Sequence, residues 1–180
     1  GPWTLGTGDQ NLALKAGAQA GIVIDKTHTF GGAYTGVVFG FTQAAANTFM
    51  NTNYLNNNLE ASNGGSLAFS RSIGKTGYGT GTVITVKNAD GTVAATYVVV
   101  IFGDADGNGL INGQDTTAVQ AAVNVASTYA NNSVQRMAAN CQNVAVAVVM
   151  HNLNGQDTTA VKNHVNGTKL DQAALASRMQ

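Results

Sequence analysis

The sequence predicts two domains, an all-β sandwich over residues 1–102 and an all-α domain over residues 103–180. Up to residue 102 the apolar runs are short and are separated by Gly, Asn and Thr, which is typical of strands joined by turns. After that point the apolar residues recur at helical spacing. A loop that begins at residue 103 separates the two patterns, so we place the domain boundary there.

Six short apolar runs are the candidate strands of the first domain. They are residues 12–14, 21–24, 37–41, 67–69, 82–86 and 93–102. Asp90-Gly91 lies between the last two runs and is a strong hairpin signal, because this pair suits a tight two-residue turn. The stretch from Thr42 to Met50 has the composition of a short helix that Thr42 caps. We therefore expect a sandwich with one helical connection.

Three helices are predicted in the second domain. Their expected ranges are 116–126, 132–140 and 158–166. In the first of them Val119, Val123 and Ala126 have the spacing of one helix face. Asp115 stands directly before this helix and can cap its N-terminus.

A calcium-loop pattern begins at Asp104. Its oxygen-bearing groups stand at positions 1, 3, 5, 7, 9 and 12, from which an EF-hand-type loop binds Ca²⁺. These groups are Asp104, Asp106, Asn108, the backbone carbonyl of Leu110, Asn112 and Asp115. Gly109 occupies position 6, where the chain must turn sharply and φ > 0 is needed. The pattern predicts one Ca²⁺ site, and the alternative is an Asx-Gly turn without a metal.

The end of this loop is repeated later in the chain. Residues 112–119 and 154–161 both read Asn-Gly-Gln-Asp-Thr-Thr-Ala-Val. The run before the first loop is rich in β-branched and aromatic residues and predicts a strand. The loop therefore has an exiting helix without an entering one, which is half of an EF-hand.

The second repeat lacks a matching calcium loop. Counting back from Asp157 puts apolar side chains where the first three ligands should stand. They are Val146, Val148 and Met150. Ca²⁺ takes hard oxygen ligands. Therefore either this half has lost its ion, or an insertion has enlarged the loop so that Asn140 and Asn143 supply the ligands instead. We interpret Asp157 as a helix N-cap rather than a ligand.

Half an EF-hand used twice is the organisation of a dockerin, and residues 103 to about 170 resemble one. Residues 79–104 resemble the Ig-like X module that often precedes dockerins in Firmicutes, notably in gut and rumen ruminococci. The resemblance implies an Ig-like sandwich followed by an all-α dockerin with an EF-hand-like loop. It also implies binding to a cohesin module of a scaffoldin, which would attach a secreted enzyme or adhesin to a cellulosome- or amylosome-type complex for polysaccharide degradation.

The resemblance further implies which residues contact the cohesin. They are Gly113, Gln114, Thr116, Thr117 and Gln120 in the first repeat, and Gly155, Gln156, Thr158, Thr159 and Lys162 in the second. Because both helix starts carry the same residues, a pseudo-twofold rotation could present either one to the same cohesin. The pair Gln120 and Lys162 breaks this symmetry.

Composition excludes several other classes of function. The formal net charge is zero and only 10% of the residues are charged, so no basic face is available for nucleic acid or for a membrane surface. The apolar runs are too short to span a membrane. The single Cys141 excludes an internal disulfide and is expected to be a buried small residue. Gly1-Pro2 looks like a protease-cleavage scar, so we expect an excised C-terminal fragment whose targeting segment was left out. The low charge and abundant Asn, Thr and Gly suit a secreted or cell-surface protein. We expect the chain to be monomeric when free.

An enzyme is not expected. Outside the calcium loop no spacing suggests a pair of catalytic carboxylates, and no Ser or Cys elbow accompanies the histidines. We expect His164 to lie at the surface or in a partner contact. The alternative to an assembly module is an Ig-like stalk or adhesin end whose calcium loop only stabilises the fold. Repetition of exposed small and polar residues favours recognition, since rigidity needs only one loop.

Overall fold

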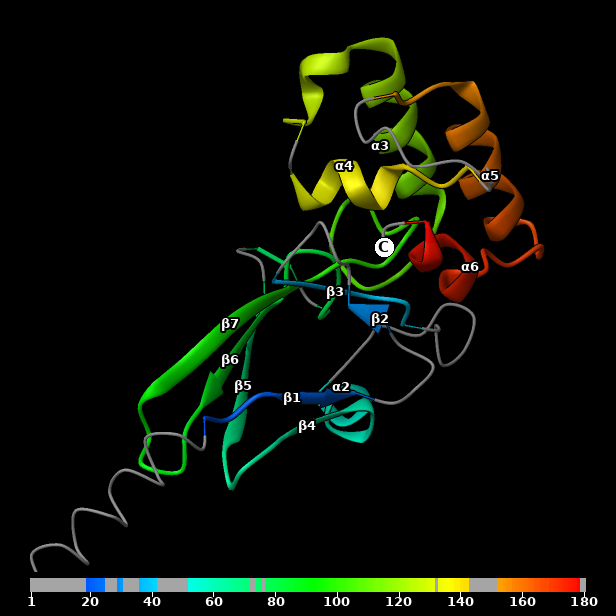
Figure 1. The fold of residues 1–180 in the computed structure, drawn as a ribbon. Coiled ribbons are helices and arrows are strands. Elements are labelled where there is room, and N and C mark those ends of the chain that lie inside the picture. The colour runs from blue at the N-terminus through cyan, green and yellow to red at the C-terminus, as the bar shows by residue number, and fades with distance from the viewer. Residues whose placement is uncertain are drawn as a thin grey trace, which may run out of the picture.

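The computed structural model describes residues 19–24, 29–30, 36–41, 52–71, 74–75, 77–131, 133–142 and 152–178. Within these ranges the chain is a mixed α/β protein (Figure 1). The predicted fold class, an all-β sandwich followed by an all-α domain, is therefore wrong. The candidate strand at residues 12–14 and the candidate helix from Thr42 to Met50 lie outside the described residues.

The strands form one sheet of five and a separate pair. Their bounds are β1 Ile22–Ile24, β2 Thr29–Phe30, β3 Val37–Phe39, β4 Leu59–Ala61, β5 Ser66–Ser70, β6 Val83–Lys87 and β7 Val93–Val99. The five-stranded sheet has the order β2-β3-β7-β6-β5, and β1 pairs with β4. Helix α2, Thr52–Asn58, leads directly into β4.

Two features of this sheet distinguish it from the expected sandwich. Strand β3 runs parallel to β7, so that Val37 stands opposite Val98, whereas an Ig-like sandwich is built from antiparallel sheets. The second sheet among the described strands has only two strands, β1 and β4, which is fewer than either sheet of an Ig-like sandwich contains. Alternating apolar residues predict that a strand exists but carry no information about its partner or its direction, which is why the sequence did not reveal this pairing.

The hairpin expected at Asp90-Gly91 is confirmed. Strands β6 and β7 are antiparallel, with Ile84 opposite Tyr97. In the turn, the Asp90 carboxylate accepts hydrogen bonds from the backbone N–H and the hydroxyl of Thr92, at 3.0 and 2.6 Å. An Asp side chain that bonds two residues ahead is a common way to close a tight turn.

The three helices predicted in the second half are confirmed, with shifted bounds. They are α3 Gly113–Asn124, α4 Val134–Ala139 and α5 Gly155–Val165, and a short 3-10 turn, η1 Ala126–Thr128, follows α3. Helices α3 and α5 begin before Asp115 and Asp157, because Asn112 and Asn154 are the N-caps and each Asp completes a capping box three residues later. The interpretation of Asp157 as the N-cap itself is thus corrected.

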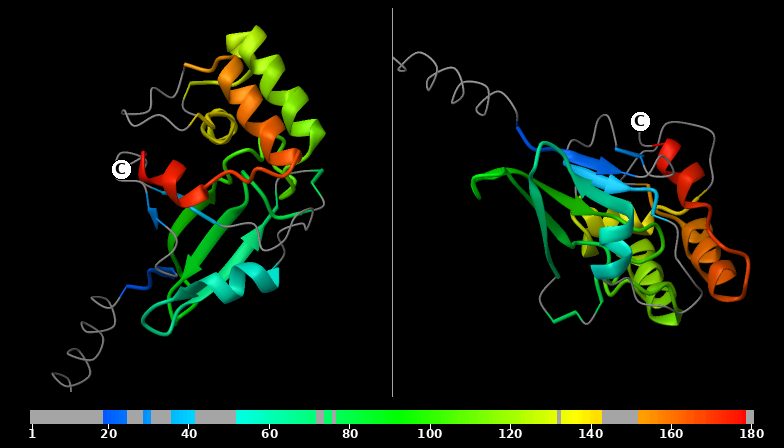
Figure 2. Two further views of the ribbon diagram at one scale, coloured as in Figure 1. Left: turned by 90° about the vertical axis from the view of Figure 1, so that its right-hand side faces the viewer. Right: turned by 90° about the horizontal axis from the view of Figure 1, so that it is seen from below.

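A further helix, α6, Gln172–Ser177, was not predicted. Helices α3, α4 and α5 gather beyond one end of the five-stranded sheet, and α6 lies between them and β2 (Figures 1 and 2). Buried apolar residues on both sides of residue 103 form one cluster, in which the Phe39 and Phe102 rings lie 6.0 Å apart. No helix in the described ranges is long and apolar enough to cross a membrane.

Candidate metal centre and helix-pair groove

Three of the predicted metal ligands come together. Carboxylate oxygens of Asp104, Asp106 and Asp115 all lie within 4.8 Å of one another, and Asp104 and Asp115 are fully buried. Ca²⁺ binds oxygens at 2.3–2.6 Å, so oxygens that share one ion are separated by at most about 5 Å. The spacing of this Asp cluster therefore suits a single metal ion.

Asp104 has one carboxylate oxygen in use and one without a partner. Its Oδ2 accepts hydrogen bonds from the backbone N–H groups of Thr80 and Gly109, at 2.9 and 3.0 Å. Its Oδ1 is buried and has no hydrogen-bond partner among the described residues. A buried oxygen without a partner is costly, and a cation bound by the Asp cluster would satisfy it.

The charge of the cluster is unfavourable without a cation. Burial, reinforced by the neighbouring carboxylates of Asp115 and Asp106, holds the pKa of Asp104 well above its ordinary value. Burial, followed by the charge of Asp106, raises the pKa of Asp115 to about 7. Either a proton or a metal ion must therefore compensate this site near neutral pH.

The other three predicted ligands are Asn108, the Leu110 carbonyl and Asn112, and the side chains of both Asn residues are engaged within the loop. Asn108 Oδ1 accepts a hydrogen bond from the Leu110 N–H at 2.9 Å, and its amide donates to Asp106 at 3.3 Å. Asn112 Oδ1 accepts from the Gln114 N–H at 3.0 Å as the cap of α3. The Asn112 oxygen is thus used by the helix cap, which leaves the three Asp side chains as the strongest ligand candidates.

A segment ahead of β6 closes the loop from outside, and sequence analysis missed it. A Cβ on Gly79 would collide with Asp104 Oδ2 and with the Gly109 backbone, and a Cβ on Gly107 would lie 2.5 Å from the Thr80 carbonyl. Thr80 is itself held by Ile101, whose N–H donates to the Thr80 hydroxyl at 3.0 Å. The only available signal was the glycine-rich run at 77–81, since such runs often mark close approach of two backbones.

The second repeat places a single acid in the equivalent position. Asp157 is fully buried and accepts hydrogen bonds from the backbone N–H groups of Cys141 and Asn154, at 2.8 and 2.9 Å. Asp115 accepts in the same way from Asp106 and Asn112, at 3.1 and 2.9 Å. By this comparison Cys141 occupies the place of Asp106, so the loop before Asp157 is longer than the loop before Asp115.

The structure describes only part of the second loop. Asn140 is buried and its carbonyl accepts a hydrogen bond from Arg178, whereas Asn143 lies outside the described residues. The three apolar residues counted back from Asp157 also lie outside them. Cys141 is buried as expected, and burial raises the pKa of its thiol far above the ordinary value.

His164 does not lie at the surface, contrary to the prediction. It is only 3% exposed, and its Nδ1 accepts a hydrogen bond from the Leu170 N–H at 2.9 Å. Burial, together with the positive charge of Lys169, lowers the pKa of His164 to about 4. The neutral imidazole is therefore a structural part of the turn between α5 and α6.

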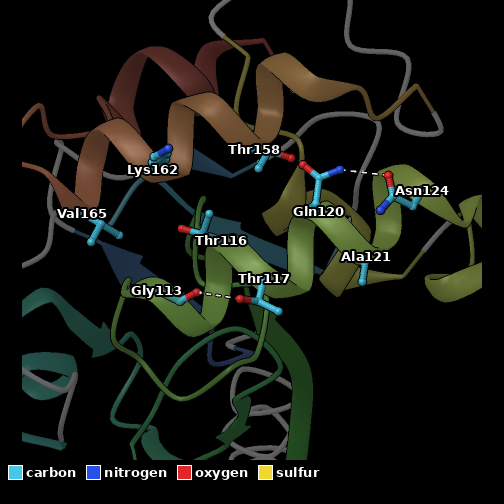
Figure 3. A pocket seen from close by; sticks show the side chains of 9 residues that line it. All are labelled: Gly113, Thr116, Thr117, Gln120, Ala121, Asn124, Thr158, Lys162 and Val165. Atoms are coloured by element: carbon cyan, nitrogen blue, oxygen red, sulfur yellow. Dashed lines mark hydrogen bonds between the residues drawn. The ribbon is translucent and has the colours of Figure 1, made fainter.

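The residues expected to contact a partner lie on two helices that pack together. Most of them are exposed, while Thr116 and Thr158 are half-buried. An open groove runs between α3 and α5 (Figure 3). Six of the ten expected contact residues line it: Gly113, Thr116, Thr117, Gln120, Thr158 and Lys162.

The two helices are arranged with local pseudo-symmetry. They run in opposite directions, so that Gly113 at the start of α3 and Val165 at the end of α5 lie toward the same end of the groove (Figure 3). The hydroxyl of Thr117 donates to the Gly113 carbonyl at 3.2 Å, and that of Thr159 donates to the Gly155 carbonyl at 3.0 Å. Equivalent residues therefore make equivalent bonds at both helix starts.

Comparison with known proteins gives no family. No protein-family model, curated protein or solved structure matches the chain. Function therefore has to be argued from the Asp cluster and the groove themselves.

Proposed function

We propose that this chain is a non-catalytic assembly module that binds a cohesin of a scaffoldin in a calcium-dependent manner. It would thereby attach a secreted enzyme or adhesin to an extracellular complex for polysaccharide degradation. The observation that carries the proposal is the pair of identical helix starts on α3 and α5, which expose the same Gly-Gln pair on two helices that border one groove.

The duplication is better explained by recognition than by packing. The repeated Gly-Gln pairs, at 113–114 and 155–156, are exposed on both helices and contribute nothing to the core. Buried positions are repeated as well, because Asp115 and Val119 are matched by Asp157 and Val161, whereas Ala122 is matched by His164. Packing explains the repetition of the buried residues but not that of the exposed Gly-Gln pairs, which supports a binding surface.

Calcium is the ion that the ligand chemistry favours. Three carboxylates supply only hard oxygen ligands, which suit Ca²⁺ rather than a softer transition metal. Asp104, Asp106 and Asp115 would hold the ion, with Asn108, the Leu110 carbonyl and Asn112, through water, as further ligands. By neutralising the carboxylates the ion would fix the loop that delivers Gly113 to the groove.

A structural role is the second candidate. Asp104 accepts a hydrogen bond from Thr80, which precedes the central hairpin, so a bound ion would also stiffen the junction between sheet and helices. In that case the chain would be a stalk or adhesin end, and the groove would have no partner.

Charge replacements on the two helix starts distinguish the two roles. Gln114→Arg and Gln156→Arg, made singly and together, would be titrated against a panel of scaffoldin cohesins by calorimetry in calcium. Gln135→Arg is the matched control, because Gln135 is exposed on α4 and belongs to neither helix start.

We expect binding to be lost in the double variant and retained in the control. We expect Gln114→Arg to weaken binding more than Gln156→Arg, because the start of α3 is ordered by calcium. If each single variant binds normally and only the double fails, the two helices are interchangeable. If all three variants bind as the wild type does, this face is not the interface and the structural role is favoured.

A further inference from the structure

Asp157 is a buried carboxylate whose four hydrogen bonds all come from amide groups. Its Oδ1 accepts from the backbone N–H groups of Cys141 and Gln142, at 2.8 and 3.1 Å. Its Oδ2 accepts from the Gln142 side-chain amide and from the Asn154 N–H, at 2.8 and 2.9 Å. Amide donors satisfy its lone pairs but carry no net charge, so a nearby cation would stabilise the carboxylate further.

Arg178, near the end of the described residues, brings a positive charge to this region. The Arg178 guanidinium donates to three backbone carbonyls, of Leu175 at 3.0 Å, of Asn140 at 2.6 Å and of Gln142. It also lies 5.4 Å from the centre of the Phe102 ring. Arg178 is therefore half-buried against the core, with donors directed at the segment that binds Asp157.

A single peptide group joins the two charges. The Asn140 carbonyl accepts from Arg178, and the N–H of the same peptide unit, on Cys141, donates to Asp157. Gln142 adds bonds from two different peptide units, since its carbonyl accepts from Arg178 while its N–H, in the preceding unit, donates to Asp157. The dipole of the peptide between Asn140 and Cys141 is therefore aligned between a positive and a negative group, and hydrogen bonds in such chains strengthen one another.

Among the described residues, the first repeat shows no such arrangement around its equivalent acid. Asp115 stands beside Asp104 and Asp106, and this Asp cluster calls for a cation from solution. In the second repeat Cys141 stands where Asp106 stands in the first, so the additional carboxylate is missing and the positive charge is supplied by the chain.

We propose that Arg178 is an internal counter-cation that orders the start of α5 without a metal ion, as the ion of the Asp cluster orders the start of α3. The proposal rests on the repeat and not on cohesin binding. With Arg178 in this role, the start of α5 does not depend on calcium, and the second repeat can lack acidic ligands.

The test compares Arg178→Met with the control variant Lys169→Met. Lys169 is exposed, so the control removes a positive charge from the protein surface in the same region. Both would be studied with calcium bound, by amide hydrogen exchange, thermal unfolding and calcium calorimetry. In Arg178→Met we expect the protection of the Cys141, Gln142 and Asn154 amides to fall at least tenfold and Tm to fall by about 5–10 °C. Calcium stoichiometry should stay at one, with an affinity within about threefold of the wild type.

Arg178→Lys is a second variant that tests the same proposal if Arg178→Met does not fold. A lysine keeps the charge but cannot donate to three carbonyls in a fixed fork, so we expect protection of the same amides between those of the wild type and the Met variant. Protection at wild-type levels in both Arg178 variants, or a second calcium ion whose uptake Asp157→Asn abolishes, would overturn the proposal.

Discussion

Phe102 and Gln172 exchange two hydrogen bonds. The Phe102 N–H donates to Gln172 Oε1 at 2.9 Å, and Gln172 Nε2 donates to the Phe102 carbonyl at 2.7 Å. Both residues are buried, and Phe102 stands two residues before Asp104 of the Asp cluster. A side chain at the start of α6 thus completes the backbone bonding of the chain that leaves the sheet, and it connects α6 to the segment that carries the Asp cluster.

Gln172→Ala should be strongly destabilising, because it leaves a buried N–H and a buried carbonyl of Phe102 without partners. We expect a loss of about 3 kcal/mol in the free energy of unfolding. Denaturant unfolding in calcium measures it. Gln120→Ala is the control, since Gln120 is exposed on α3 and bonds only Asn124, and it should cost less than about 0.5 kcal/mol. Equal effects of the two changes would show that the Phe102 contact contributes little.

Gly79→Ala should damage the metal site from outside the loop. The new Cβ would collide with Asp104 Oδ2 and the Gly109 backbone, so we expect about 3 kcal/mol of destabilisation and weaker calcium binding. Gly113→Ala is the matched control, because a Cβ there meets nothing within 4 Å and should stabilise the helix by about 0.5 kcal/mol. Unchanged calcium affinity in Gly79→Ala would mean that residues 79–80 do not support the site.

Calcium uptake should fall as the pH falls through about 7, because burial raises the pKa of Asp115 to about 7 and protons then compete with the ion. In the metal-free protein, a fall in pH has the opposite effect and increases the stability of the fold. A carboxyl with a raised pKa binds its proton more tightly when folded, so the metal-free protein should gain stability as the pH falls from about 7 toward 4. Calorimetry at pH 8 and 5.5 measures the calcium uptake, and unfolding of the metal-free protein at the same two pH values measures its stability. Asp104→Asn should take up no calcium. A metal-free protein that is most stable at pH 8 would contradict this.

Acid should destabilise the turn around His164 by a separate route. Burial lowers the pKa of His164 to about 4, below its ordinary value of 6.5, so its contribution to stability is present above pH 6.5 and is lost as the pH falls toward 4. His164→Asn keeps an acceptor for the Leu170 N–H without titrating. We expect the free energy of unfolding of the wild type relative to this variant to fall by up to about 3 kcal/mol between pH 7 and 4. A constant difference would show that His164 does not titrate in this range.

Local patterns in the sequence predicted the local parts of this structure. The repeated Asn-Gly-Gln-Asp run predicted two helix starts, and the spacing of Asp104, Asp106 and Asp115 predicted that their carboxylates meet, because each depends on neighbours in the chain. Contacts between distant residues were not predictable in this way. Thr80 lies 24 residues from Asp104, and Phe102 lies 70 residues from Gln172.

The fold class was wrong for the same reason. Strand β3 joins β7 in parallel, and α6 completes the core at Phe102, but neither relationship leaves a periodic signal in the sequence. The N-caps of α3 and α5 were also assigned to the wrong residues. Asp115 and Asp157 were recognised as capping residues, yet Asn112 and Asn154 are the N-caps, because both partners of a capping box are good capping residues and sequence alone did not rank them.

The most direct test of the central claim is cohesin binding measured by surface plasmon resonance in calcium and again in excess chelator, with Asp104→Asn as the calcium-free variant. The proposed function predicts that at least one scaffoldin cohesin binds in calcium. It also predicts that chelation or Asp104→Asn weakens this binding roughly 100-fold or more, because the start of α3 is no longer fixed. Failure of every cohesin to bind the calcium-loaded protein, or binding that chelator leaves unchanged, would contradict the claim.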